Sequence, residues 1–170
     1  MKRPYNIIVL VLLTFFMLNL QSCSVNYGFT GAPITAKTIT IDYFPNKASL
    51  VNPVLSQEFT QALRDEFVGQ TKLQLVKQNG QLQLSGAIVN YYTTAMAIQG
   101  NEQAALNRLS ITINVKFVNT LNEEESFEQD FTGFQDYDAS QNFAAVEGDL
   151  VNTIIGRMVQ DIFNRALLNW

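Results

Sequence analysis

The chain has 170 residues, a formal net charge of −4, no histidine and a single cysteine. The lack of histidine excludes a Ser-His-Asp triad and a histidine-based zinc site, and one cysteine excludes an intramolecular disulfide and a cysteine metal cluster. The length favours one domain with a sizeable core. Because the charge is acidic, we expect no nucleic-acid partner, and no motif indicates a cofactor or a metal site.

Residues 1–22 have the build of a secretory signal peptide. Lys2 and Arg3 precede an apolar run at residues 7–20, which is shorter than the roughly 20 residues that span a bilayer. The run leads into a Leu-Gln-Ser-Cys ending that resembles a lipobox. We therefore expect cleavage before Cys23 and acylation of this cysteine, with palmitate among the acyl chains. The alternative is an uncleaved anchor with an ordinary buried cysteine.

Lipid on Cys23 predicts where the mature protein resides, because two or more acyl chains anchor a protein stably to a membrane. Ser24 follows the cysteine, and similarity to other lipoproteins implies that an aspartate there would favour the inner membrane. We expect an outer-membrane location on the periplasmic side. Cleavage leaves nine basic and fifteen acidic residues, a net charge of −6, and residues 23–37 serve as lipidated N-terminus and tether.

Two kinds of periodicity predict the first half of the folded domain, residues 38–170. Alternation over residues 38–43 predicts a strand that buries Ile39, Ile41 and Tyr43. Asn52 and Pro53 suit the start of a helix, and Gly69 its end. The apolar stripe of this helix is Leu55, Phe59, Ala62, Leu63 and Phe67.

A hairpin is predicted next. Residues 72–77 form a short strand with Leu73 and Leu75 inward, and Asn79-Gly80 is a strong hairpin turn signal. Residues 81–92 return as a longer strand, in which Gly86 marks a bulge.

The clearest strand pattern covers residues 108–118. Apolar and polar residues alternate there, with Arg108 and Lys116 on the polar face. An acidic loop at 119–125 leads to a last strand at 127–134. A closing helix starts from Phe143, with Ser140 as its cap. The apolar members of the strand are Leu109, Ile111, Ile113, Val115 and Phe117, and those of the helix are Val146, Leu150, Ile154, Met158, Ile162 and Ala166.

This order of elements predicts an α+β fold. Two amphipathic helices pack on one face of a mainly antiparallel sheet of four to five strands, as a two-layer sandwich.

The segment from Cys23 to Phe67 contains the most specific motifs of the chain. It contains Phe29-Thr30-Gly31, then Ile-Asp-Tyr-Phe-Pro-Asn at 41–46 and Leu-Val-Asn-Pro at 50–53. These motifs resemble a divergent branch of the LptE family of lipopolysaccharide-assembly lipoproteins. The order of elements fits that family through Trp170.

The resemblance implies a function and partners. LptE-type lipoproteins sit in the lumen of the outer-membrane barrel LptD, help to assemble that barrel, and aid insertion of lipopolysaccharide into the outer leaflet. Family members contact lipid A phosphates through basic residues. Arg108 and Lys116 are the candidates here, although no motif matches them to the family's positions. Both also suit an ordinary solvated strand face.

Two other functions stay open. The first is a periplasmic lipoprotein module of another envelope or secretion complex, which would share the anchor and a similar α+β layout without binding lipopolysaccharide. An enzyme is not expected, because the acidic pairs at Asp136 and Asp138 and at 123–125 have the pattern of solvated loops.

Overall fold

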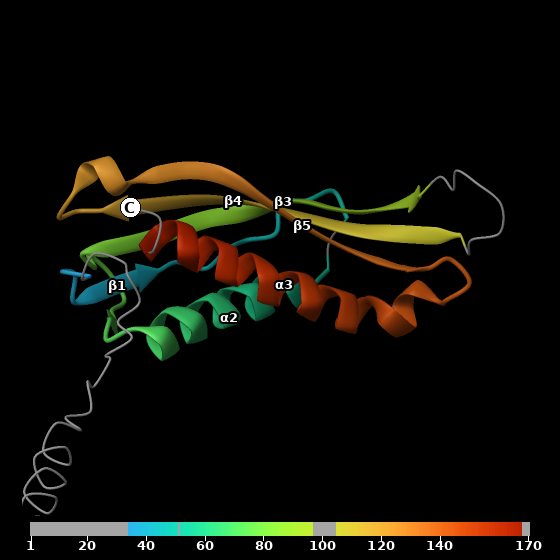
Figure 1. The fold of residues 1–170 in the computed structure, drawn as a ribbon, viewed down its shortest axis with the longest axis horizontal. Helices are drawn as coiled ribbons and strands as arrows, with labels where there is room; N and C mark the ends of the chain where they lie inside the picture. The colour runs from blue at the N-terminus through green and yellow to red at the C-terminus, as the bar shows by residue number, and fades with distance from the viewer. Residues whose placement is uncertain (1–33, 51, 97–104, 168–170) are drawn as a thin grey trace, which may run out of the picture. The chain divides into compact units, whose positions relative to one another are not determined.

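The computed structural model describes residues 34–50, 52–96 and 105–167. They form one mixed sheet in the order β2-β1-β3-β4-β5, and two long helices pack against one of its faces (Figure 1). The elements are β1 Thr38–Ile41, α2 Leu55–Gln70, β2 Gln74–Leu75, β3 Leu82–Met96, β4 Leu106–Asn119, the short 3-10 helix η1 Glu123–Glu125, β5 Phe127–Asp138 and α3 Phe143–Leu167. The expected two-layer α+β sandwich is confirmed, with a mixed sheet in place of a mainly antiparallel one. The signal segment and Cys23 lie outside the described residues.

The three long strands β3, β4 and β5 pair antiparallel, and β4 lies between the other two. The predicted alternation of β4 is confirmed, because its five inward apolar side chains are at most 1% exposed. Gly86 on β3 has φ +157°, and a Cβ there would lie 2.0 Å from the carbonyl oxygen of Asn114. The β3–β4 register shifts between Ile88 and Asn90, two residues beyond the predicted bulge.

β1 follows the predicted alternation only as far as Ile41. Ile39 and Ile41 are buried, but the predicted inward residue Tyr43 is 56% exposed, so that prediction is wrong. Phe44 is buried in its place, and its ring packs edge-on against Phe59 of α2 at 5.1 Å. The chain leaves strand geometry after Ile41, so the two-residue alternation of faces no longer holds.

The Asn79-Gly80 turn does not connect a hairpin. β2 and β3 lie on opposite sides of β1 and both run parallel to it, so the turn leads across β1. Asn79 adopts the left-handed φ of 56°, as the turn signal implied. A Cβ at Gly80 would lie 2.5 Å from the Thr40 nitrogen, so only glycine fits beside β1. Leu73 is buried as predicted, whereas Leu75 is exposed.

The two helices bury their predicted stripes against the sheet and each other, except that Ala62 of α2 and Val146 of α3 are only partly buried. The Asn52 side chain accepts hydrogen bonds from the Val54 and Leu55 amides, which confirms its role at the start of α2. α2 continues through Gly69 to Gln70, so Gly69 is not its end. At α3, Asn142 accepts from the Ala144 amide in the role predicted for Ser140.

Candidate functional site

The sheet face opposite the helices is uncovered by any described element. Side chains that alternate with the core residues of β3, β4 and β5 point to this open face. Its centre is polar and paired across strands: the hydroxyl oxygens of Thr112 and Thr132 lie 3.0 Å apart, and Asn114 donates to Asp130 at 2.9 Å. Both candidate basic residues lie on this face.

Arg108 is held by its neighbours on the open face. Its guanidinium donates two hydrogen bonds to the Asp136 carboxylate, at 2.6 and 2.9 Å. The same group lies over the Phe134 ring, with its central carbon 3.8 Å from the ring centroid. The hydrogen bond from Arg108 holds the pKa of Asp136 below its usual range. The positive charge of Arg108 is therefore already paired with a carboxylate in the described structure.

Lys116 has a different environment near the other end of β4. Its side chain is exposed, between Ser85 of β3 and Glu128 of β5 in the sheet register, and no described residue forms an ion pair with it. It lines an open polar cavity of about 460 Å³. The cavity is also lined by Thr40, Asp42, Lys77, Gln78, Asn79, Gln83, Ser85 and Val118.

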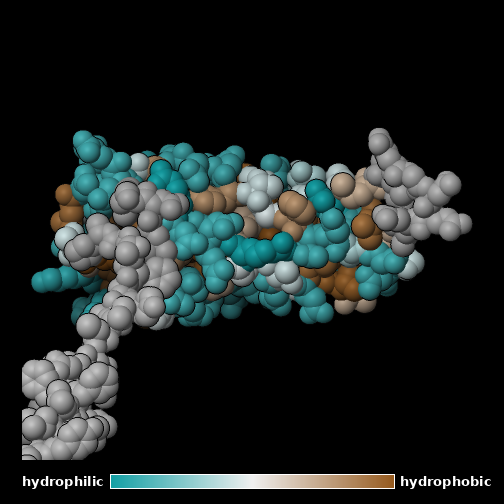
Figure 2. All heavy atoms as spheres, in the orientation of Figure 1, coloured by the Kyte–Doolittle hydropathy of each residue, from teal (hydrophilic) through white to brown (hydrophobic). Residues whose placement is uncertain are grey.

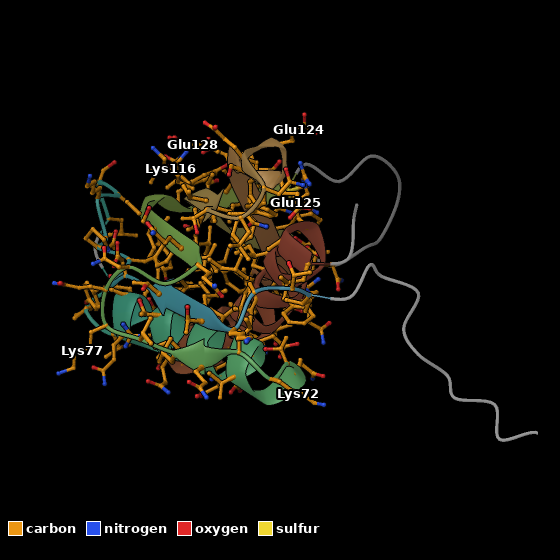
Figure 3. All side chains as sticks on the ribbon, turned by 90° about the vertical axis from the view of Figure 1, so that its left-hand side faces the viewer. Lys72, Lys77, Lys116, Glu124, Glu125 and Glu128 are labelled. Carbon is orange, nitrogen blue, oxygen red and sulfur yellow. The ribbon has the colours of Figure 1, made fainter. Side chains whose placement is uncertain are left out.

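Lys77 is a basic residue that the sequence did not single out. It follows β2, and Figure 3 shows it apart from Lys116 at this end of the domain, while Lys116 and Glu128 lie close together. Lys77 reaches the cavity because the chain crosses β1 between β2 and β3. No sequence pattern places Lys77 at this cavity, because its position depends on the crossing of β1, which was not predicted.

The structure does not bring Arg108 and Lys116 together. They are eight residues apart on one continuous strand, which is roughly 26 Å at about 3.3 Å per residue. A single phosphate cannot touch both. Lys116 and Lys77 both line one cavity, and they are more available than Arg108, which is already paired with Asp136.

The end of the open face that holds Arg108 is also partly apolar. Four large apolar side chains there are between 37% and 45% exposed, and they come from β3, β4 and β5. They are Tyr92, Met96, Leu106 and Phe134. By contrast, Figure 2 shows a largely hydrophilic surface with scattered apolar patches on the side that it presents.

The acidic residues considered for catalysis have structural contacts. Asp138 accepts hydrogen bonds from the amide and hydroxyl of Ser140, which hold its pKa below the usual range. Glu125 accepts from Asn119 and Asn122 in the β4–β5 connection. Within the described ranges, no three histidine, cysteine or acidic residues gather as a metal site. No helix of those ranges has the length and apolarity to cross a membrane.

Comparison with solved structures reveals proteins of similar fold. A minor lipoprotein of Acinetobacter baumannii matches with a TM-score of 0.51 and 14% identity, over 76% of this chain and 91% of that one. A protein of Xanthomonas campestris matches with a TM-score of 0.52 and 8% identity, over 81% and 89%. A hypothetical protein of Chlamydia trachomatis matches with a TM-score of 0.50 and 11% identity, over 77% and 93%. At these identities the likeness shows the fold alone.

Comparison by sequence identifies the family. No curated protein matches the chain. The family model described as LptE, lipopolysaccharide-assembly, matches residues 36–166, which include almost all of the described domain. The chain therefore belongs to the LptE family of lipopolysaccharide-assembly proteins.

Proposed function

We propose that this protein is lipidated at Cys23, resides at the outer membrane on its periplasmic side, and docks in the lumen of an LptD-type β-barrel. There it helps to assemble the barrel and to insert lipopolysaccharide into the outer leaflet. The observation that carries the proposal is the family match over residues 36–166. The polar centre of the open face supports it as well, since barrel lumens are polar.

Copurification tests the partner. A C-terminally tagged chain is extracted with detergent from outer membranes, and the expected companion is a large β-barrel protein. The Cys23→Ala variant should stay unprocessed and should recover much less of the barrel. Recovery of a different envelope or secretion complex, without a barrel, would support the rival lipoprotein function instead.

We also propose that the cavity beside Lys116 binds a phosphorylated sugar of the lipopolysaccharide. Its lining combines two lysines and one carboxylate, Asp42, with hydroxyl and amide side chains. The lysines suit a phosphate, and the other polar groups suit sugar hydroxyls. Arg108 stays a second candidate at the far end of β4. Its guanidinium would have to leave Asp136 before it paired with a phosphate.

Charge reversal tests this cavity. The Lys77→Glu/Lys116→Glu variant should bind lipopolysaccharide more weakly than wild type, and the difference should shrink as salt is added. The Lys47→Glu/Lys72→Glu variant is the matched control, because it changes the net charge equally at exposed residues outside the cavity. Equal losses in both variants would exclude the cavity as a specific site.

A further inference from the structure

β5 forms a long edge of the sheet, and no strand of the described residues pairs with its outer side. The opposite edge, β2, has two residues, whereas β5 has twelve and pairs with β4 from Phe127 to Asp138 without a register shift. Proteins commonly protect sheet edges by shortness, bulges, proline or inward charges. β2 is protected by its shortness. β5 has no bulge, no proline and no inward charge.

The direction of the free backbone groups of β5 follows from two hydrogen bonds. Arg157 of α3 donates to the Phe134 carbonyl at 3.0 Å from outside the β4–β5 ladder, and the Ala139 amide donates to Ala105 on the β4 side at 2.8 Å. In an antiparallel pair, the N–H and C=O of one residue point the same way and alternate along the strand. The backbone N–H and C=O groups of the even-numbered residues of β5 therefore point away from β4. Arg157 occupies the outward carbonyl at Phe134, whereas no described residue bonds to the outward backbone groups of Glu128, Asp130 and Thr132.

Two carboxylates flank this edge at residues 128–132 on the open face. The cations near β5 include Lys116 of β4, which lies opposite Glu128, and Arg157 and Arg165 of α3, which contact Phe134 and Phe127. Glu128 and Asp130 are exposed on the open face, and β5 contains no lysine or arginine. A strand added at the edge would place alternate side chains next to these carboxylates, where basic residues are favoured and acidic ones are not. A second copy fits poorly. Antiparallel pairing centred on Asp130 places that carboxylate opposite its own copy, and a shift to the next register places Glu128 opposite Asp130.

We propose that the outer edge of β5 at Glu128, Asp130 and Thr132 is a strand-addition site for an extended segment of another protein that carries lysine or arginine at alternate positions. The main-chain groups of the three residues supply affinity, and the two carboxylates select the partner. The segment differs in chemistry from the phosphorylated sugar proposed for the cavity, although Glu128 lies opposite Lys116 of that cavity in the β4–β5 register.

The probe is a capped nine-residue peptide of alternating threonine and lysine, added to the full ¹⁵N-labelled chain in detergent. Amide hydrogen exchange is followed by NMR. The peptide should slow exchange at Glu128, Asp130 and Thr132. Exchange at the alternate amides 129, 131 and 133, which already face β4, should change little. The same peptide with glutamate in place of lysine should have no effect.

Two variants separate strand addition from general attraction between opposite charges. Glu128→Lys/Asp130→Lys should reverse the preference, so that the glutamate peptide binds and the lysine peptide does not. Thr132→Pro removes one outward N–H without touching the β4 ladder and should weaken peptide binding, whereas Thr132→Val should not. Peptide binding without slowed exchange at these three amides would overturn the proposal. So would no binding, or protection of the same amides by self-association of the chain.

Discussion

The Arg108 guanidinium on β4 and the Asp136 carboxylate on β5 form an ion pair with two hydrogen bonds near one end of the open face. The hydrogen bond from Arg108 keeps the pKa of Asp136 below its usual range. The stability that this carboxylate contributes is therefore fully present above the ordinary carboxyl pKa and is lost as pH falls through the lowered folded value. Denaturant unfolding at pH 7 and at about pH 2 should show a smaller acid loss for Asp136→Asn than for wild type. Equal acid losses would show that the pair does not contribute.

Two glycines in different settings should respond oppositely to alanine. Gly86→Ala should destabilise the domain strongly, because the new Cβ would collide with the Asn114 carbonyl at a positive φ. Gly156 lies on the exposed side of α3, and a Cβ there would have no neighbour within 4 Å. Gly156→Ala should therefore stabilise the helix by about 0.5–1 kcal/mol. Urea unfolding of both variants gives the two free energies. A tolerated Gly86→Ala would contradict the described β3–β4 contact.

The two faces of β4 should differ sharply in tolerance. Ile113 is fully buried, so Ile113→Asp buries an unpaired carboxylate and should cost several kcal/mol, on the order of 3–5. Lys116→Thr, three residues along on the exposed face, should stay within about 0.5 kcal/mol of wild type. Thermal unfolding compares them, and similar losses would mean that the strand register is wrong.

Tyr91 should make the domain sensitive to alkali. Its hydroxyl donates to Glu147 of α3, and burial raises its pKa well above the usual tyrosine value. Because the folded-state pKa is raised, the stability that Tyr91 contributes is complete below about pH 10, the ordinary tyrosine value, and declines above it. Tyr91→Phe should cost about 1 kcal/mol at pH 7 and lose less stability at alkaline pH than wild type. Tyr92→Phe is the control, because Tyr92 is exposed on the other face.

Local patterns in the sequence predicted those parts of the fold that local physics decides. The apolar period of α2 and α3 and the alternation of β4 each fix one buried face, and the structure confirms all three. The crossing of β1 was missed because parallel pairing joins residues about 40 apart, and Asn79-Gly80 has the same turn preference in a hairpin or a crossing. Tyr43 was misplaced because no local signal marks where strand geometry ends.

The same distinction explains the candidate site. Alternation placed Arg108 and Lys116 on one face of β4, and the structure agrees. Whether either cation is available depends on partners from other strands. Asp136 is 28 residues from Arg108, and Lys77 reaches the cavity only through the β1 crossing. Periodicity along one strand can predict neither the pairing of Arg108 with Asp136 nor the place of Lys77 beside the cavity.

Depletion of the protein in its own bacterium is the most direct measurement of its proposed role in the lipopolysaccharide translocon. Barrel assembly is followed by heat-modified migration on gels, and lipopolysaccharide in the outer leaflet by labelling of intact cells. The proposal predicts that depletion leaves the LptD-type barrel misassembled and lowers surface lipopolysaccharide, and that wild type restores both but Cys23→Ala does not. Normal barrel assembly and unchanged surface lipopolysaccharide after depletion would contradict it.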